Sequence, residues 1–172
     1  MEPPTYLAEK NPHPRDSNIT FDEGPHIYTI NGDSSFTSVT TWNHSHFEKF
    51  NADKIIDNMM NSSNWTESKY YGKTKEEIKL EWKLNGQEAS KMGTAMHQMF
   101  EYYYNKINPE KINSYENTKE YNYFKNFVND HNLLVPYRTE WNVFHEDHKI
   151  SGSIDMTFLN DDRTISIYDW KR

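Results

Sequence analysis

The last third of the chain alternates between apolar and polar residues, over residues 135–144 and again on both flanks of a polar run at 160–163. Side chains of a strand change face at every residue, so alternation is typical of strands that bury one face. The polar run is typical of a turn between antiparallel strands. The pattern therefore predicts a three-stranded antiparallel meander, in which Asp155 and Asp169 can lie side by side.

The middle of the chain has the spacing of amphipathic helices. Apolar residues recur every three or four positions over residues 87–105 and 119–132, which predicts two helices with apolar faces toward a core. Thr74 and Glu77 have the spacing of a capping box, which predicts the start of an earlier helix. We expect that helix to break or bend at Asn85-Gly86.

Three residues one helical turn apart, Gly93, His97 and Glu101, share a face of the longer helix. Glycine costs a helix about 1 kcal/mol relative to alanine, so Gly93 suggests close packing. On the residues alone, His97 is more often a hydrogen-bonded core histidine than a metal ligand. Glu101 is interpreted as an exposed or helix-pairing residue rather than a ligand.

The first part of the chain is predicted to be less regular. Prolines among polar residues at positions 1–18 indicate a flexible segment. Residues 19–21 and 26–30 are interpreted as short strands, and Asn31-Gly32-Asp33 has the composition of a type I′ turn. Ser38 or Thr37 is predicted to cap a helix, and a second short helix is expected to begin at Asn51 or Asp53.

The composition agrees with one folded domain. The 172 residues are 34% hydrophobic and 15% aromatic, which is enough to bury a core. A small hairpin, several helices and then a meander predict an α+β fold for residues 19–172. The absence of cysteine excludes disulfides and thiolate metal sites. Without an apolar run long enough to cross a bilayer, we expect an intracellular protein that does not contact membranes.

The formal net charge of -7 disfavours a protein that binds DNA tightly and non-specifically. It is compatible with an acidic cluster that holds metal ions, because the ions reverse the local field. Asp155 and Asp169 carry the carboxylates that magnesium prefers. Lys171 shares the face of Asp169 and can position a water or help to deprotonate it. An Asp-x-Lys sequence on its own is more often an exposed ion pair.

Several short motifs occur together in a fixed order. They are Gly93-Thr94-Ala95-Met96-His97, Glu140, Gly152-Ser153-Ile154-Asp155 and Asp169-Trp170-Lys171. The set resembles the PD-(D/E)xK nucleases, and within them the RecB-like exonuclease branch. There a helix carries Gly-x-x-x-His, a strand carries Gly-x-x-Asp and the next strand carries Asp/Glu-x-Lys. With the segment around Ser38 included, residues 27–172 look most like uncharacterised nucleases of large eukaryotic DNA viruses.

The resemblance implies a restriction-endonuclease-like core and a metal-dependent deoxyribonuclease. Such a hydrolase would cleave phosphodiester bonds during DNA replication, recombination or repair. The implied cofactor is magnesium or manganese, and the implied partner is DNA rather than RNA. The implied location is the cytoplasm or nucleus, or a viral replication site in the host cell.

The resemblance also implies roles for individual residues. Those with a catalytic role are Asp155, Asp169 and Lys171, of which the lysine would orient the attacking water. The implied metal ligands are His97, Asp155, Asp169, the backbone carbonyl of Trp170 and, as an additional acid, Glu140. Supporting positions are Gly93, Gly152 and Ser38.

One departure from the family leaves two hypotheses open. The family usually continues into a helix with Gln-x-x-x-Tyr and further strands, whereas this sequence ends at Arg172. We therefore expect a domain incomplete at its C-terminus, with a further polypeptide or a second subunit as partner. The first hypothesis is a metal-dependent, exonuclease-like DNA nuclease. The alternative is a catalytically silent nuclease-like module that binds nucleic acid or a partner protein.

Overall fold

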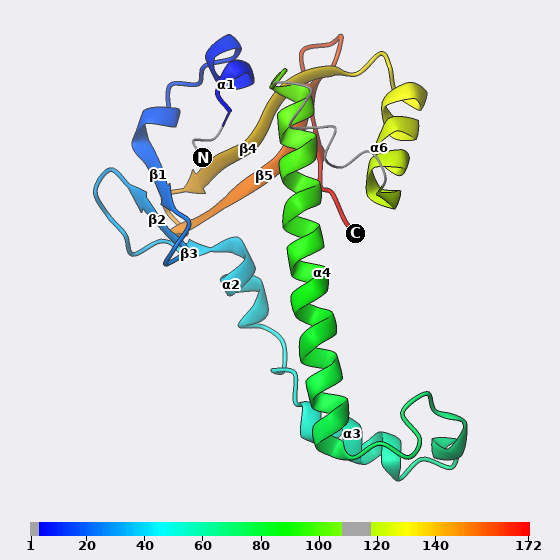
Figure 1. The fold of residues 1–172 in the computed structure, drawn as a ribbon. Coiled ribbons are helices and arrows are strands. Elements are labelled where there is room, and N and C mark those ends of the chain that lie inside the picture. Colours follow the sequence, from blue (N-terminus) through cyan, green and yellow to red (C-terminus); the bar gives the residue numbers. More distant parts are fainter. Residues whose placement is uncertain (1–3, 108–117) are drawn as a thin grey trace.

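The computed structural model describes residues 4–107 and 118–172 (Figure 1). The chain is an α+β fold in which helices surround a small mixed sheet. In chain order the elements are α1 (Tyr6–Lys10), the 3₁₀ turn η1 (Asp16–Asn18), β1 (Ile19–Asp22), β2 (Ile27–Ile30), β3 (Thr37–Ser38), α2 (Val39–His44), α3 (Ala52–Met60), the 3₁₀ turn η2 (Trp65–Glu67), α4 (Lys75–Tyr104), α6 (Lys119–Asp130), β4 (Val135–His145), β5 (Ile150–Leu159) and β6 (Ile165–Tyr168).

The described strands form a two-stranded sheet, β1 with β2, and a larger four-stranded sheet. In the larger sheet β3, β4 and β6 all pair with β5. β4 pairs with it antiparallel along almost its whole length, from Val135 opposite Leu159 to His145 opposite Ile150. On the other edge of β5, β3 pairs parallel with its first residues and β6 pairs antiparallel with its last ones. The predicted meander of β4, β5 and β6 is confirmed. The parallel β3 was not predicted, because two residues carry no periodic signal.

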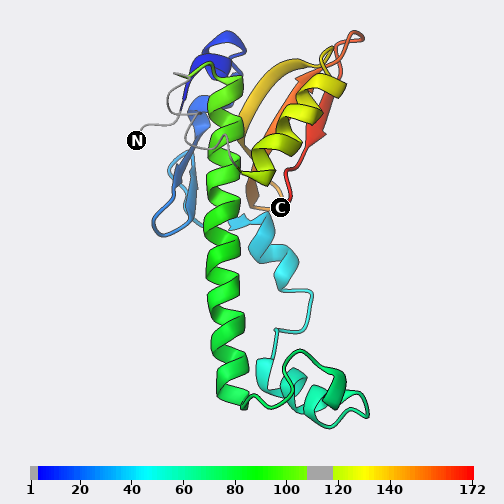
Figure 2. The same ribbon diagram turned by 45° about the vertical axis from the view of Figure 1, so that its right-hand side comes forward.

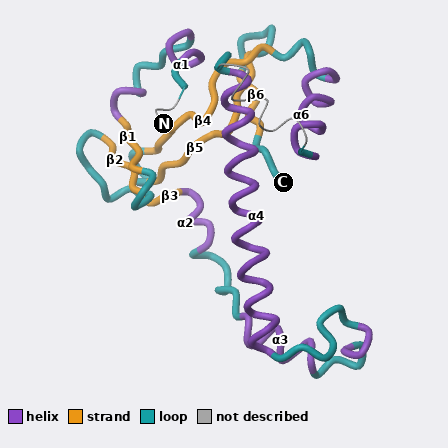
Figure 3. Tube along the Cα trace, viewed as in Figure 1, coloured by secondary structure: helices purple, strands orange, loops and turns teal. Residues whose placement is uncertain are grey.

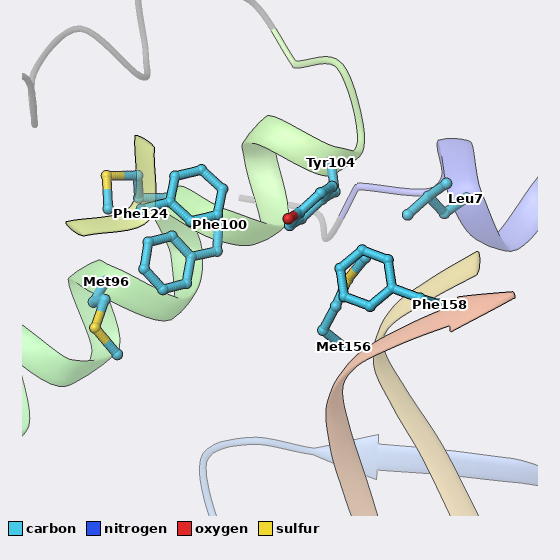
Figure 4. Packing of buried hydrophobic residues seen from close by; sticks show 8 residues of the cluster. Leu7, Met96, Phe100, Tyr104, Phe124, Met156 and Phe158 are labelled. Atoms are coloured by element: carbon cyan, nitrogen blue, oxygen red, sulfur yellow. The ribbon is translucent and has the colours of Figure 1, made fainter. Parts of the chain in front are cut away.

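The main hydrophobic core lies between this sheet and the C-terminal half of α4, with α1 and α6 at its sides (Figure 1, Figure 2). The rings of Phe100 on α4 and Phe124 on α6 stack with their centroids 4.1 Å apart. The buried members of the core are Leu7, Met96, Met99, Phe100, Tyr104, Phe124, Met156 and Phe158 (Figure 4). The helices and the strands of the meander therefore share one core.

The N-terminal half of α4 extends away from the sheet, and α3 and η2 lie at its far end (Figure 1, Figure 3). A second, smaller cluster forms there from Ile56, Tyr70 and Ile78. Among the residues described, no helix is both long enough and apolar enough to cross a bilayer. α4 thus contributes residues to both hydrophobic clusters, Ile78 to the smaller one and Met96, Met99, Phe100 and Tyr104 to the main one.

Most of the predicted turns and caps are confirmed. Asn31 and Gly32 take positive φ values of 50° and 84°, as the type I′ turn requires. Ser38 caps α2 by accepting a hydrogen bond from the Thr41 backbone N–H at 3.1 Å. The capping box at the start of α4 is complete, because its threonine and its glutamate each bind the other's backbone N–H.

The predicted break at Asn85-Gly86 is wrong, because α4 runs unbroken through both residues. Good helix formers such as lysine, glutamate, leucine and alanine flank the pair, and their summed propensity exceeds the cost of one glycine. The packing expected at Gly93 is also wrong, because a Cβ added there would meet nothing within 4 Å. Glycine in α4 therefore lowers stability without setting the path of the helix.

Replacing Gly86 with alanine is expected to raise the free energy of unfolding by about 0.5–1 kcal/mol. The added Cβ meets nothing within 4 Å, and the backbone there is already helical. Urea denaturation measures the change. Gly72→Ala is the matched control, because its site is equally open but its φ of 83° strains an alanine, so it should destabilise. A Gly86→Ala protein less stable than the parent would contradict the continuous helix.

Within residues 4–18, α1 contacts the core and β4, and η1 lies beside β4. Leu7 is buried, and its backbone N–H donates to the Asn105 side chain at 3.0 Å. The Asp16 carboxylate accepts hydrogen bonds from Arg138 at 2.8 Å and from the Trp141 indole at 3.0 Å. Because Arg138 is buried, this ion pair supplies the counter-charge that the guanidinium needs.

Asp16→Ala is expected to lower the free energy of unfolding by about 3 kcal/mol at pH 7, since it leaves the buried Arg138 without its partner. Burial acts to raise the pKa of Asp16, but hydrogen bonds from Arg138, the His13 backbone and Trp141 outweigh it and lower that pKa. The carboxylate therefore stabilises the fold fully above its unfolded pKa of about 3.9, and the effect is lost as pH falls through the lower folded value.

Denaturation curves at several pH values test this, with Asp57→Ala as the control. Asp57 makes an exposed ion pair with Lys75, so its loss should cost less than about 1 kcal/mol. The difference between parent and Asp16→Ala should shrink below about pH 4. A difference that stays constant down to pH 2 would show that the ion pair is not its source.

Candidate metal centre

Three elements bring one ligand side chain each to a single point: His97 from α4, Glu140 from β4 and Asp155 from β5. The His97 Nδ1 atom lies 3.5 Å from Glu140 Oε1 and 3.7 Å from Asp155 Oδ2. One ligand atom from each of the three lies within 4.8 Å of the other two. An imidazole nitrogen and two carboxylate oxygens at such distances can share one divalent cation.

The β4–β5 register places Glu140 directly across from Asp155. The flanking pairs are Thr139 with Met156 and Trp141 with Ile154, so the two acids occupy the position between them. Glu140 has a φ of 41°, in the left-handed region. Of the described non-glycine residues with positive φ, it alone lies inside a strand. Such a conformation costs about 1–3 kcal/mol and is concentrated at functional sites.

The left-handed residue changes which way β4 presents its side chains. Thr139 accepts a hydrogen bond at 2.8 Å from Asn105, which directly follows α4, and its neighbour Glu140 reaches His97 on α4. In a regular strand two neighbours point to opposite faces. The kink at Glu140 therefore turns its carboxylate to the same side as Thr139, where the histidine lies.

Trp170 fixes the orientation of the histidine ring. Its backbone carbonyl lies 3.2 Å from His97 Nε2, and a carbonyl oxygen can only accept, so Nε2 carries the proton. In neutral His97 the lone pair of Nδ1 then points toward two carboxylates, which are also acceptors. That arrangement is unfavourable unless a proton or a metal ion lies between them. Ligating histidines commonly donate their second N–H to a backbone carbonyl in this way.

The pKa values of three groups at or near the centre are raised, and nearby carboxylates contribute to each shift. The hydrogen bond to Glu140 raises the pKa of His97, and the charge of Asp155 adds to the effect although burial opposes it. Burial raises the pKa of Asp155. Burial and the nearby Glu140 also raise the pKa of Glu101 to about 7. A cation bound at the centre would lower all three of these pKa values.

Asp169 and Lys171 lie just beyond β6 and pair with each other, with Lys171 Nζ 2.7 Å from Asp169 Oδ2. Their shared face agrees with the spacing argument from the sequence. Among the described residues, those close enough to hold one ion are His97, Glu140 and Asp155, and Asp169 stands outside that group. The Trp170 backbone N–H donates to Asp155 Oδ2 at 2.8 Å, which ties this segment to the centre.

The supporting positions lie at different places. Ser38 and Gly152 are where α2 meets the sheet, and a Cβ on Gly152 would come 3.4 Å from Val39. Gly93 faces open space one turn before His97. None of these three belongs to the ligand group. They shape or flank the elements that carry the ligands.

Two residues near the centre were not predicted from the sequence to have a role there. Glu101, predicted to be exposed or helix-pairing, is partly buried and interacts electrostatically with Glu140. The sequence signal for a role of Glu101 is its position one helical turn after His97. Ser153 donates a hydrogen bond from its hydroxyl to Glu140 Oε2 at 3.3 Å. It precedes Asp155 by two residues, so strand alternation places both on one face.

Comparison with known proteins finds no match to a family model, to a curated protein or to a solved structure.

Asp155→Asn is expected to weaken manganese binding by about tenfold or more, because it removes a charged ligand while keeping an oxygen that can accept from Trp170. Titration followed by the relaxation of water protons measures the affinity. Asp161→Asn, in the exposed turn after β5, is the control with the same chemical change. Equal affinities for the two variants would locate the ion elsewhere.

Proposed function

We propose that this chain is a metal-dependent nuclease of the PD-(D/E)xK type that hydrolyses phosphodiester bonds in DNA. The observation that carries the proposal is the geometry of His97, whose Nδ1 atom lies 3.5 Å from Glu140 and 3.7 Å from Asp155 while its Nε2 atom is bonded to Trp170. The donor set fits magnesium or manganese, since both bind carboxylate oxygen and manganese also accepts imidazole. The motif order quoted from the sequence supports the same class.

A divalent ion held by these ligands supplies Lewis acidity, which lowers the pKa of a bound water and offsets charge on the phosphate. Asp155 and Glu140 provide the negative charge that binds it, and His97 provides the nitrogen. Ser153 and Trp170 hold the Glu140 and Asp155 carboxylates in place by hydrogen bonds.

The proposed role of Lys171 is to position water and to neutralise charge. Its hydrogen bond to Asp169 raises the pKa of the ammonium group, so Lys171 stays protonated at neutral pH. A protonated lysine donates hydrogen bonds and cannot take a proton from water. Asp169 acts here by holding Lys171 next to the centre.

The arrangement of the elements supports a restriction-endonuclease-like core as the finer assignment. The acids lie on adjacent antiparallel strands, the lysine follows the third strand, and the histidine comes from a helix packed on them. The partner we propose is DNA, with the bound ion reversing the negative field of an acidic protein.

The position of Asp169 favours a second candidate, a nuclease-like module that binds nucleic acid or a protein without cleaving it. Asp169 lies outside the ligand group and is bonded to Lys171, whose side chain is 78% exposed. A centre that holds the ion without this aspartate would bind metal and yet lack one charge for catalysis. The experiment below separates the two candidates.

The test is manganese-dependent degradation of end-labelled linear DNA, run beside closed circular DNA. Asp155→Asn and Lys171→Met are each expected to slow cleavage by about 100-fold or more, because ligand and charge-stabilising groups act in the transition state. Lys149→Met, which removes an exposed lysine paired with Asp33, is the control and should cleave normally. Loss of the linear substrate alone indicates an enzyme that works from ends.

Cleavage that survives both Asp155→Asn and Lys171→Met would refute the assigned site. A parent protein that binds manganese through Asp155 but cleaves neither DNA would support the module that binds without cleaving.

A further inference from the structure

A pocket of about 230 Å³ lies between α4, α6 and the residues that follow β6. We propose that it receives one nucleobase at the end of a DNA strand. The inference rests on the proposed function and makes it narrower, because it names the substrate as DNA with an unpaired terminal nucleotide.

The first argument is that one residue joins the pocket to the metal centre. The Trp170 backbone contacts two ligands, accepting at its carbonyl from His97 and donating from its N–H to Asp155. The Trp170 side chain lines the pocket instead, with its ring 5.1 Å from that of Phe100. Met96, the neighbour of His97 in α4, also lines it. A nucleotide in the pocket therefore has its phosphate within reach of the centre.

The second argument is the chemistry of the walls. Five of the nine lining residues are aromatic: Phe100 and Phe124 are buried, Phe127 and Trp170 are partly exposed, and Tyr123 is exposed. Bases stack on such rings with little regard to sequence, because every base has a π-face. The volume is below the roughly 300–1,000 Å³ typical of pockets for drug-sized ligands, so it suits a single ring system.

The third argument is the polar edge of the pocket, where Glu120, Lys171 and Arg172 lie. Arg172 uses its Nε to bond Glu120 at 2.9 Å, and a guanidinium has further N–H donors beyond that one. Lys171 is paired with Asp169, so the donors left at this edge are the remaining N–H groups of the Arg172 guanidinium. The edge thus suits the phosphate of a nucleotide whose base lies against the rings.

Tyr123 is the wall residue best suited to a test. Its side chain is 71% exposed although it belongs to the aromatic wall, so replacing it should leave the core intact. Tyr71, 58% exposed in the turn between η2 and α4, is a matched tyrosine that does not line the pocket. The two substitutions remove the same ring from different places.

The experiment measures binding of short single strands with 2-aminopurine at either end, in EDTA so that no strand is cut. Binding should quench the fluorescence at one of the two ends. Tyr123→Ala should weaken binding by about fivefold or more, as loss of a stacking ring does, whereas Tyr71→Ala should change it less than twofold. A strand whose corresponding end is abasic should bind as weakly to the parent as the intact strand binds to Tyr123→Ala.

Equal affinity of the parent for intact and abasic ends would overturn the proposal, whatever the effect of Tyr123→Ala. That result would favour an apolar side chain of a protein partner as the occupant of the pocket. Equal loss in the Tyr123→Ala and Tyr71→Ala proteins would also overturn it. Because binding is measured without metal, a catalytically silent chain can still pass this test. A chain that cleaves DNA can still fail it.

Discussion

The antiparallel pairing of β4 with β5 is the constraint on which the rest of the structure depends. It aligns Glu140 with Asp155 across the ladder, and it makes β5 the strand that also receives β3 and β6. A shift of one residue in this register would move every side chain of β4 to the other face. Thr157 helps to hold it, since its buried hydroxyl bonds both the N–H and the carbonyl of Arg138.

The stabilising contacts of Arg138 and the candidate metal ligand Glu140 lie on different sides of β4. On one side Arg138 and Trp141 converge on Asp16, a well-matched buried ion pair with an aromatic neighbour. On the other side Glu140 holds a strained backbone and faces another acid. The first arrangement stabilises the strand on both flanks of the kink. Backbone strain persists only where the surroundings determine it, and the contacts of Arg138 and Trp141 with Asp16 are part of the surroundings of Glu140.

Local patterns in the sequence were enough to predict the meander, the capping box and the tight turn. Each depends on residues close together in the chain, such as Thr74 with Glu77. The left-handed φ of Glu140 could not be predicted, because it follows from contacts with α4 and η1, which are remote in sequence. The same holds for the burial of Glu101. The expected break at Gly86 failed for the opposite reason, since a local signal was given more weight than the helix propensity around it.

The negative charge of the centre bears on the stability of the fold. Glu101, Glu140 and Asp155 gather around one histidine, and the nearby Lys171 is already paired with Asp169. Like charges at partly buried positions favour protonation or a bound cation. An ion that binds only the folded centre stabilises the fold through mass action. An ion bound at the proposed centre would join the residues that the strand pairing assembles, and it would thereby couple metal affinity to fold stability.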